Sequence, residues 1–409
     1  MRDIDYVLEF CVNLSRNMIM SGANLERVQT AVDTVCRAYG LHDVSIYLLS
    51  IRISLSAYDS EGNYSSRQTS IPSSGIYLDR LRSLNQLSYK IAEITPNPKT
   101  LAQMLERAMN VKDYPEAVIV AGKICAMLCL GFIFGAKLWD AVLVAVITVL
   151  IHFVMSWLER TGLDRILINS LTMWAAASCA VMFLYSGFRG NFAVIMITVT
   201  MLVIPGIPLV NAMRNLLCGH EINGILQMLK ISVETMALAL GIYAAFMMFG
   251  GEGMIVPASG MSDTWLLVAL SFMASVGFGI VFRIPPKDLW LAGLGGALSR
   301  LSVIVLPGIL PGRFAYMTIS ASVAALYAEF LAVKRRQPST YFVYPAIIPL
   351  IPGDLFFYAI SGIYMGEKLW LETNGVNCLI SLAGLTMGFV LASTVAIHAR
   401  RVRYMLWEK

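Results

Sequence analysis

Ten predominantly apolar stretches constrain this chain more than any other feature of its sequence. They cover residues 117–136, 138–158, 166–186, 191–211, 231–250, 264–282, 289–308, 314–333, 340–362 and 376–398. A helix of roughly 20 residues crosses the hydrocarbon core of a bilayer. The chain is 57% hydrophobic and 14% charged, whereas soluble proteins have roughly 45–50% apolar and about 25% charged residues. We therefore predict an α-helical polytopic membrane protein. A disordered chain, a secreted disulfide scaffold and a soluble nucleic-acid binder are excluded.

The charges divide the chain into two parts. Residues 1–115 carry 12 Lys/Arg and 12 Asp/Glu, whereas residues 116–409 carry 19 and 14 and hold the whole net charge of +5. The first part has the composition of a soluble domain. Asp3, Asp5 and Glu9 interrupt its beginning, so it does not resemble a signal peptide. We expect residues 1–115 to form a cytoplasmic domain.

Hydrophobic spacing predicts a small α+β fold for this domain. Two helices are expected first, one long strand follows, and a partner strand and two more helices complete the domain. The expected ranges are 4–21, 24–39, 43–58, 64–71, 76–94 and 98–110.

Catalytic and metal-binding patterns are missing from the sequence. The domain contains a single histidine, His42, and the seven cysteines of the chain show no metal-ligand spacing. No GxSxG, HExxH or phosphate-binding glycine loop is present. We expect no metal, no cofactor and no enzyme activity. A structural or regulatory role is favoured for residues 1–115.

Lys and Arg residues predict the orientation of the spans, because cytoplasmic loops are enriched in them. If residues 1–115 are inside, the inner loops and the C-terminal tail carry thirteen Lys and Arg residues, and the outer loops carry four. We therefore expect ten spans, with both termini in the cytoplasm.

An internal repeat is indicated at an offset of 147 residues. Val203-Ile-Pro-Gly206 resembles Leu350-Ile-Pro-Gly353, and at the same offset Ala212, Gly219 and Gly241 fall on Ala359, Gly366 and Gly388. We predict two five-span repeats, at residues 116–260 and 261–409. Because five is odd, the second copy enters the membrane from the opposite side, an architecture typical of secondary transporters.

The fourth and ninth spans are predicted to be discontinuous, because proline removes a backbone donor and clashes with the preceding turn. Half-helix termini near the midplane can bind a carboxylate. A simple kink packed by neighbouring helices is the alternative. The expected substrate-binding residues are Pro205, Gly206, Pro208, Asn211, Pro349, Pro352, Gly353 and Arg300.

Charged residues inside spans are costly and usually functional. Asp354 follows the second Pro-Gly break and is the first candidate for proton coupling, with Glu329 and Glu234 as further candidates. Arg300 is predicted either to pair with Asp354 or to anchor a substrate carboxylate. A purely structural Arg300–Asp354 pair remains an alternative. His152 is interpreted as a packing residue.

Three segments resemble the threonine/serine exporter family. They are Leu14–Val28, the strand region Ile51–Ser56, and Ile204–Leu217, which is similar to the family's most specific membrane motif. The second half, with Pro349-Leu-Ile-Pro-Gly353, resembles the family's smaller module, so the chain looks like a fused single-chain member. Asn215 departs from the pattern, in which an acidic residue is expected after the motif arginine.

The resemblance implies a ten-span transporter of the cell inner membrane that exports threonine and serine, driven by the proton motive force. Related two-protein systems are associated with succinate export, so a dicarboxylate exporter is an alternative. A second alternative is a membrane-anchored enzyme or sensor that acts through residues 1–115. The expected partners are the small-molecule substrate, protons and the lipid bilayer, with no nucleic acid, and a homo-oligomer is left open.

Overall fold

The protein is described from a computed structural model, which covers residues 2–48, 52–71, 75–204, 206–217, 219–250, 260–335 and 337–407. The chain forms two compact units. Unit 1 contains residues 1–114, 282–286 and 330–342, and unit 2 contains residues 115–281, 287–329 and 343–409. Each unit is described by itself.

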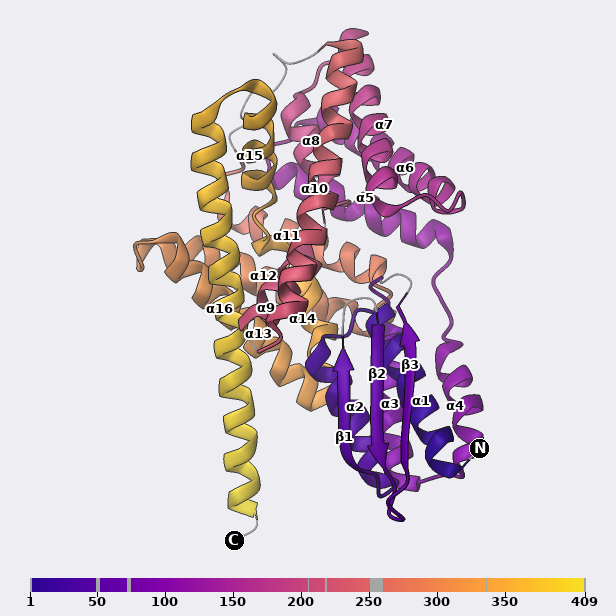
Figure 1. The fold of residues 1–409 in the computed structure, drawn as a ribbon. Helices are drawn as coiled ribbons and strands as arrows, with labels where there is room; N and C mark the ends of the chain where they lie inside the picture. The colour runs from indigo at the N-terminus through magenta and orange to yellow at the C-terminus, as the bar shows by residue number, and fades with distance from the viewer. Residues whose placement is uncertain are drawn as a thin grey trace. The chain divides into compact units, whose positions relative to one another are not determined.

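Unit 1 contains a three-stranded antiparallel sheet in the order β1-β2-β3. Helices α1 and α2 pack against the sheet, and α3 packs on α1 and α2 (Figure 1). The elements of its first 114 residues are α1 (Asp3–Met20), α2 (Leu25–Ala38), β1 (His42–Leu48), β2 (Arg52–Tyr58), β3 (Tyr64–Ser70), α3 (Leu78–Ile94), η1 (Pro98–Thr100) and α4 (Leu101–Met109).

The four helices lie close to their expected positions because their signals are local. Asn24 caps α2 by accepting a hydrogen bond from the Arg27 backbone N–H at 2.9 Å. Gly22, with φ of +93°, provides the turn that follows α1. The buried side of α1 repeats every three to four residues and includes Val7, Leu8 and Leu14.

The expectation of one long strand over residues 43–58 is wrong. The segment forms two strands, β1 and β2, which pair antiparallel with Leu48 opposite Ile53. Alternating apolar and polar residues continue through both strands, so the pattern alone could not show where the chain reverses. Folding back lets the backbone groups of the two strands bond each other. Residues 49–51, between them, lie outside the described residues.

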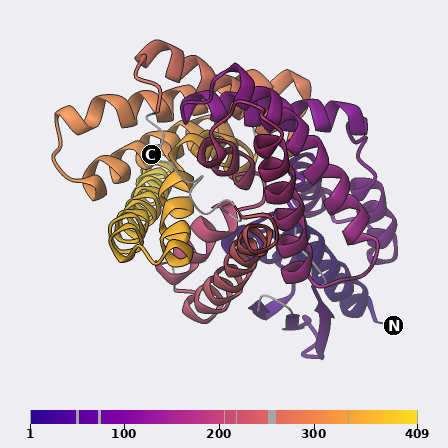
Figure 2. The same cartoon turned by 90° about the horizontal axis from the view of Figure 1, so that it is seen from above.

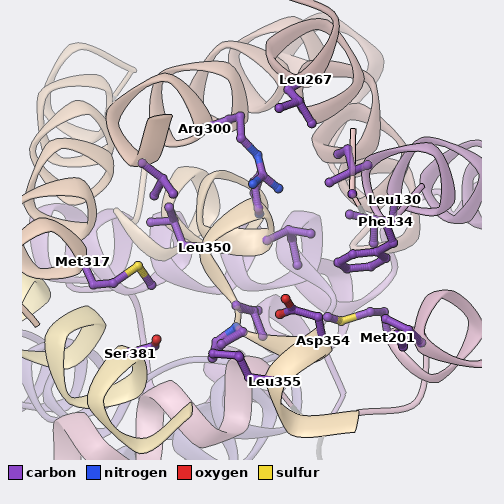
Figure 3. A pocket seen from close by; sticks show the side chains of 18 of the residues that line it. Leu130, Phe134, Met201, Leu267, Arg300, Met317, Leu350, Asp354, Leu355 and Ser381 are labelled. Atoms are coloured by element: carbon purple, nitrogen blue, oxygen red, sulfur yellow. The ribbon is translucent and has the colours of Figure 1, made fainter. Parts of the chain in front are cut away.

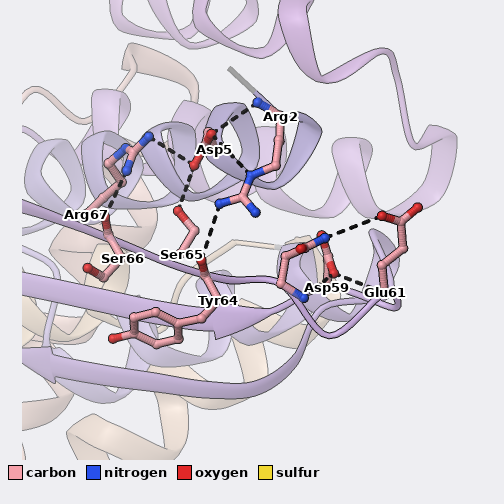
Figure 4. Close-up of polar contacts among 9 residues, drawn as sticks. Arg2, Asp5, Asp59, Glu61, Tyr64, Ser65, Ser66 and Arg67 are labelled. Carbon is pink, nitrogen blue, oxygen red and sulfur yellow. Dashed lines mark hydrogen bonds and ion pairs between the residues drawn. The ribbon is translucent and has the colours of Figure 1, made fainter.

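A polar cluster ties the start of α1 to β3 (Figure 4). Asp5 accepts hydrogen bonds from the Ser65 hydroxyl at 2.7 Å and from the Arg2 backbone N–H at 3.1 Å. Its carboxylate also pairs with Arg67 at 3.1 Å. The hydrogen bond from Ser65, above all, holds the pKa of Asp5 below its usual range.

A later segment of the chain, residues 282–286, is bonded to the first 114 residues within unit 1. The Leu78 backbone N–H donates to the Phe282 carbonyl at 2.9 Å, and the Tyr114 hydroxyl donates to the Ile284 carbonyl at 2.6 Å. Arg283 donates to Asp113 at 3.1 Å. The structure therefore holds this segment by several polar contacts.

Unit 2 is helical, and Figure 2 shows two of its helices, α15 and α16, along their axes. In chain order, the helices of the membrane part are α5 (Glu116–Ile133), α6 (Leu138–Glu159), α7 (Arg165–Tyr185), α8 (Phe192–Thr200), α9 (Gly206–Leu217), α10 (Glu221–Phe249), α11 (Thr264–Val281), η3 (Pro286–Asp288), α12 (Leu289–Val305), η4 (Leu306–Gly308), α13 (Arg313–Arg335), α14 (Thr340–Ile347), η5 (Ile348–Leu350), α15 (Gly353–Met365) and α16 (Lys368–Trp407).

Eight helices in the described part of the chain are long and apolar enough to cross a membrane. The number rises to nine if the bent pair formed by residues 340–350 and 353–363 is one span. The chain is therefore a multi-pass α-helical membrane protein. The remaining expected span, 191–211, corresponds to α8 and α9, which are too short to cross singly, so the count of ten stays a prediction.

The fourth and ninth expected spans are both discontinuous. Residues 201–204 form turns between α8 and α9, and the two halves of the ninth are bent by 54°. Pro345 lies inside α14, so the second break is at Ile351-Pro352 and not at Pro345. Pro205, predicted for the first break, lies outside the described residues.

Two glycines allow close helix packing in corresponding parts of unit 2. Gly241 of α10 lies against the α7 backbone, where an added Cβ would be 2.9 Å from the Trp174 nitrogen. Gly388 of α16 lies against the α13 backbone, where a Cβ would be 2.9 Å from the Ser322 nitrogen. Small residues permit such an approach between helices in a membrane.

We predict that Asp5→Asn weakens the attachment of α1 to β3. A carboxylate with a depressed pKa contributes stability above its unfolded pKa of about 3.9, and this is lost as pH falls through the folded pKa. At pH 7 amide hydrogen exchange in β3 should accelerate about fivefold, for a loss on the order of 1 kcal/mol. Asp3→Asn removes a charge from an exposed position of the same turn and should leave exchange unchanged. Equal effects of both variants would contradict the prediction.

We predict that Gly241→Ala and Gly388→Ala each destabilise unit 2 by about 1–3 kcal/mol, because the new methyl group meets backbone that cannot move aside. Thermal denaturation of the purified full chain in detergent measures this loss. Gly375→Ala in α16 is the matched control, since its nearest neighbour to an added Cβ is the Ala359 Cβ at 4.0 Å. A control that is as unstable as the other two variants would refute the packing argument.

Candidate functional site

A cavity of ≈ 280 Å³ lies within unit 2 (Figure 3). Its volume is near the lower end of the range for small-molecule sites, about 300–1,000 Å³. Apolar side chains form much of its wall, including Leu130, Phe134 and Met317. The polar and charged side chains that line it are Arg300, Arg313, Asp354, Tyr316, Tyr358 and Ser381.

The cavity lies at one end of the helices that surround it. It is lined by the last residues of α5, such as Ile133, and by the second half of α12, which carries Arg300 and Val303. It is also lined by the first turns of α11 and α13, at Leu267 and Arg313. The residues of the second helix break, from Ile348 to Pro352, complete its wall.

Asp354 is positioned by the helix break. It is in the first turn of α15, directly after Pro352 and Gly353. The N-terminal end of a helix carries a partial positive charge and favours an anion there. Gly353 lies directly against the end of the Met201 side chain, which comes from the turn between α8 and α9. The break therefore places a carboxylate at the cavity wall.

Arg300 faces this carboxylate from α12. Its Nε donates to the Ser271 hydroxyl of α11 at 3.1 Å, and Ser271 is fully buried. Figure 3 shows its terminal nitrogens and the Asp354 oxygens pointing toward one another across the cavity. The two charges interact electrostatically, but among the described residues no ion pair within 4.0 Å joins them. Space for a ligand therefore separates the opposite charges.

Only some of the site residues predicted from sequence line this cavity. Arg300, Pro349, Pro352 and Asp354 do, and Gly353 touches the lining residue Met201. The predicted residues that do not line it are Gly206, Pro208, Asn211, Glu234 and Glu329. Their functional roles stay predictions.

The remaining predicted residues have other neighbours. Gly206 brings the first helix break against the second, because an added Cβ would lie 2.9 Å from Cδ1 of Ile351. Asn211 donates to the Tyr344 hydroxyl at 2.9 Å. Glu234 pairs with Lys230 at 4.0 Å along α10.

Four polar residues of the cavity lining were not predicted from the sequence: Arg313, Tyr316, Tyr358 and Ser381. Arg313 directly precedes the expected span 314–333, but it is the first residue of α13 and lines the cavity. Its charge and that of Asp354 both act on the Cys378 thiol. Tyr358 could have been found, because residues four apart share one face of a helix and it follows Asp354 at this spacing.

A second group of ionisable residues joins α5 to α6 away from the cavity lining. Lys123 Nζ lies 3.1 Å from His152 Nδ1, and His152 Nε2 lies 3.2 Å from a Glu116 carboxylate oxygen. The structure shows that His152 is hydrogen-bonded at both ring nitrogens. This network stabilises a partly buried lysine within a span.

Asn215, the departure from the expected acidic residue, donates from Nδ2 to the Gln227 side-chain oxygen at 2.9 Å. A neutral hydrogen bond between α9 and α10 therefore occupies this position.

Two family models match the chain. Residues 9–249 match ThrE, described as a threonine/serine exporter, and residues 267–395 match ThrE_2, described as "Threonine/Serine exporter, ThrE". No curated protein and no solved structure matches the chain.

We predict that Arg300 and Asp354 are energetically coupled. Arg300→Met and Asp354→Asn each leave one charge unopposed, so the double variant should be more stable than the sum of the single losses implies. We expect a coupling of about 0.5–3 kcal/mol in thermal denaturation of the full chain. The pair Arg300→Met and Glu329→Gln is the control and should be additive, because Glu329 does not line the cavity. Additive losses for Arg300 and Asp354 would show that the two charges do not interact.

Proposed function

The chain belongs to the threonine/serine exporter family, and on this premise we propose that it is a secondary active transporter that exports threonine and serine in exchange for protons. Membership of an exporter family and its apolar helices make it a membrane transporter with a small-molecule substrate. Its membrane is the cell inner membrane, and both termini are cytoplasmic. The orientation rests on the distribution of Lys and Arg, and the inner membrane is what the family resemblance implies.

An inverted pair of five-span repeats is part of the proposal. Gly219 and Gly366, 147 residues apart, have φ angles of +85° and +68°. Gly241 and Gly388, at the same offset, allow the equivalent close approaches of α10 to α7 and α16 to α13. Shared conformation and shared contacts at one offset support a structural repeat.

The packing of α5 and α11 supports opposite orientations of the two copies. Gly122, early in α5, would place a Cβ 3.1 Å from the Gly277 carbonyl, late in α11. The Met261 N–H, just before α11, donates to the Ile133 carbonyl at the end of α5 at 3.2 Å. The first helices of the two copies therefore run antiparallel, as an inverted repeat requires.

The opposed charges of Arg300 and Asp354 across the cavity carry the substrate assignment. A free amino acid has a carboxylate and an ammonium group. A guanidinium binds a carboxylate in a fork geometry, and a carboxylate accepts hydrogen bonds from an ammonium group. Arg300 holds the substrate carboxylate and Asp354 its ammonium group. The tyrosine and serine hydroxyls of Tyr316, Tyr358 and Ser381 are available to a substrate hydroxyl.

Exchange for protons follows from a single carboxylate that serves two ligands. Asp354 in its ionised form attracts the substrate ammonium group, and in its protonated form it does not. The proton and the amino acid therefore compete for one site, and an inward proton flow can drive export.

A dicarboxylate is the second candidate substrate. The presence of Arg313 in the same cavity favours it, because two guanidinium groups complement two carboxylates. Protonation of Asp354 would assist the binding of a dianion and not oppose it. Proton and dicarboxylate would then move in the same direction, which does not produce export driven by the proton motive force.

Transport into inside-out vesicles tests the proposal. Labelled threonine, serine and succinate are offered with and without a proton gradient. We expect gradient-dependent accumulation of threonine and serine. Absence of gradient dependence for all three would refute the proposal. Uptake of succinate alone, without stimulation by the gradient, would assign the second candidate. Deletion of residues 1–115 tests the alternative of an enzyme or sensor, because retained transport makes this domain accessory.

We predict that Asp354→Asn abolishes gradient-driven accumulation while the protein still inserts, because an amide does not titrate. We expect a reduction of at least tenfold in the accumulation rate, corresponding to about 1.4 kcal/mol or more. Glu329→Gln is the control, since it removes a carboxyl group outside the cavity lining. Wild-type accumulation by Asp354→Asn would remove Asp354 from the mechanism. Loss in both variants would leave the cavity with no special role in coupling.

A further inference from the structure

The helices α11 and α12 pack closely beside the cavity. Gly296 of α12 lies against α11, because an added Cβ would be 2.8 Å from the Ser271 carbonyl oxygen and would collide with the Ser275 side chain. Residues four apart share one face of a helix, so Arg300 lies on the same face of α12, one turn after Gly296. The glycine therefore brings the backbones of the two helices together next to Arg300.

Ser271 is the hydrogen-bond partner of Arg300 at this contact. The Arg300 Nε donates to the Ser271 hydroxyl at 3.1 Å. Ser271 is 0% exposed and does not itself line the cavity. Because Ser271 is buried in the packed face of α11, its hydroxyl offers a fixed acceptor behind the cavity wall.

The bond leaves the outer edge of the guanidinium group available to a ligand. A guanidinium group has five N–H donors in a rigid plane, one on Nε and two on each terminal nitrogen. Ser271 engages the N–H on Nε. The terminal nitrogens point into the cavity toward Asp354 (Figure 3). Two parallel N–H groups at this edge, one from each terminal nitrogen, match the two oxygens of a carboxylate.

An oriented guanidinium group binds a ligand more tightly than a mobile one. An arginine side chain loses much rotamer freedom when a ligand immobilises it. A hydrogen bond that already holds the side chain in its binding orientation reduces this loss, because the group is preorganised. A residue that makes such a bond can therefore change the affinity for a ligand that it never touches.

We propose that Ser271 is a positioning residue of the cavity, which turns the outer edge of Arg300 toward the ligand so that one carboxylate binds to both terminal nitrogens. It acts through Arg300 and does not contact the ligand. The identity of the ligand rests on the proposed function, and the group bound at this end is a carboxylate. Asp354, at the other end, receives the ammonium group independently of Ser271.

A purely structural bond between α11 and α12 is the alternative role for Ser271. Such a bond would stabilise the cavity as a whole, so its loss would weaken the binding of every ligand. A positioning residue that acts through Arg300 affects only ligands that carry a carboxylate. Two ligands that differ in this one group therefore separate the two roles.

Equilibrium binding to the purified full chain in lipid nanodiscs makes this comparison. The ligands are serine and ethanolamine, because ethanolamine has the hydroxyl and ammonium groups of serine but no carboxylate. We expect Ser271→Ala to raise the Kd of serine about tenfold, as for the loss of a hydrogen bond made by a charged group. The Kd of ethanolamine should be the same in the wild type and in Ser271→Ala.

Two further variants serve as controls. Ser275→Ala makes the same change one turn along α11, at a buried hydroxyl that has no hydrogen-bond partner among the described residues. It should leave the Kd of serine unchanged. Ser271→Thr keeps the hydroxyl acceptor and should bind serine as the wild type does.

An unchanged Kd of serine in Ser271→Ala would overturn the proposed role of Ser271. A loss of affinity for ethanolamine as large as that for serine would also overturn it, because the whole cavity would then be affected. An equal loss of serine affinity in Ser275→Ala or in Ser271→Thr would show that the effect does not depend on the hydroxyl bonded to Arg300.

The binding assay applies no gradient, so failure of the proposed function can be recognised separately. Weaker serine binding in Ser271→Ala, together with no gradient-driven transport in vesicles, would keep the role of Ser271 and refute proton exchange. Binding of succinate alone, weakened in Ser271→Ala, would keep this role and replace the substrate. A wild type that binds none of serine, threonine and succinate would refute both.

Discussion

The need to pair backbone hydrogen-bonding groups inside a bilayer is the constraint on which the rest of this structure depends. Unpaired N–H and C=O groups are too costly in hydrocarbon, so the chain crosses as helices, and irregular backbone is tolerated only where protein or a water-filled cavity surrounds it. The chain departs from continuous helix at the turn between α8 and α9 and at Ile351-Pro352. The two breaks contact each other through Gly206 and Ile351. The second break forms part of the cavity wall.

The same constraint accounts for the position of the few charges. A carboxylate within a span is favoured where a helix begins, because free N–H groups point toward it, and Asp354 begins α15. A guanidinium group needs partners, and Arg300 has Ser271 on one side and the field of Asp354 on the other. Lys123 is accommodated by another route, through His152 and Glu116. Charges that would be costly alone are stabilised by specific neighbours, and in one such arrangement a cavity separates the opposite charges of Arg300 and Asp354.

Much of the architecture follows from local patterns. The helices of unit 1 and most of the apolar spans could be predicted because their spacing, caps and glycine stops act within a few residues. The candidate site could be predicted only in part. Arg300 and Asp354 are separated by 54 positions in the sequence and meet across one cavity. Arg313 was missed because its place at the start of a span indicated a loop, whereas the cavity extends to that end of α13. The prediction of one long strand over residues 43–58 was wrong because apolar and polar residues alternate in the same way in one strand as in two paired strands.

The sequence by itself determined the class of protein, the approximate position of each helix and the two helix breaks at Pro-Gly sequences. It could do so because hydropathy and backbone chemistry are properties of short segments. It also determined the family, through motifs in both halves. Only the tertiary structure decided which polar residues share a space. It set Asp354 opposite Arg300 around the cavity, and it joined Asn211 to Tyr344 in a hydrogen bond. Helix packing decides these distances, and packing depends on close contacts such as those of Gly241 and Gly388, whose partners lie about 70 residues away in the chain.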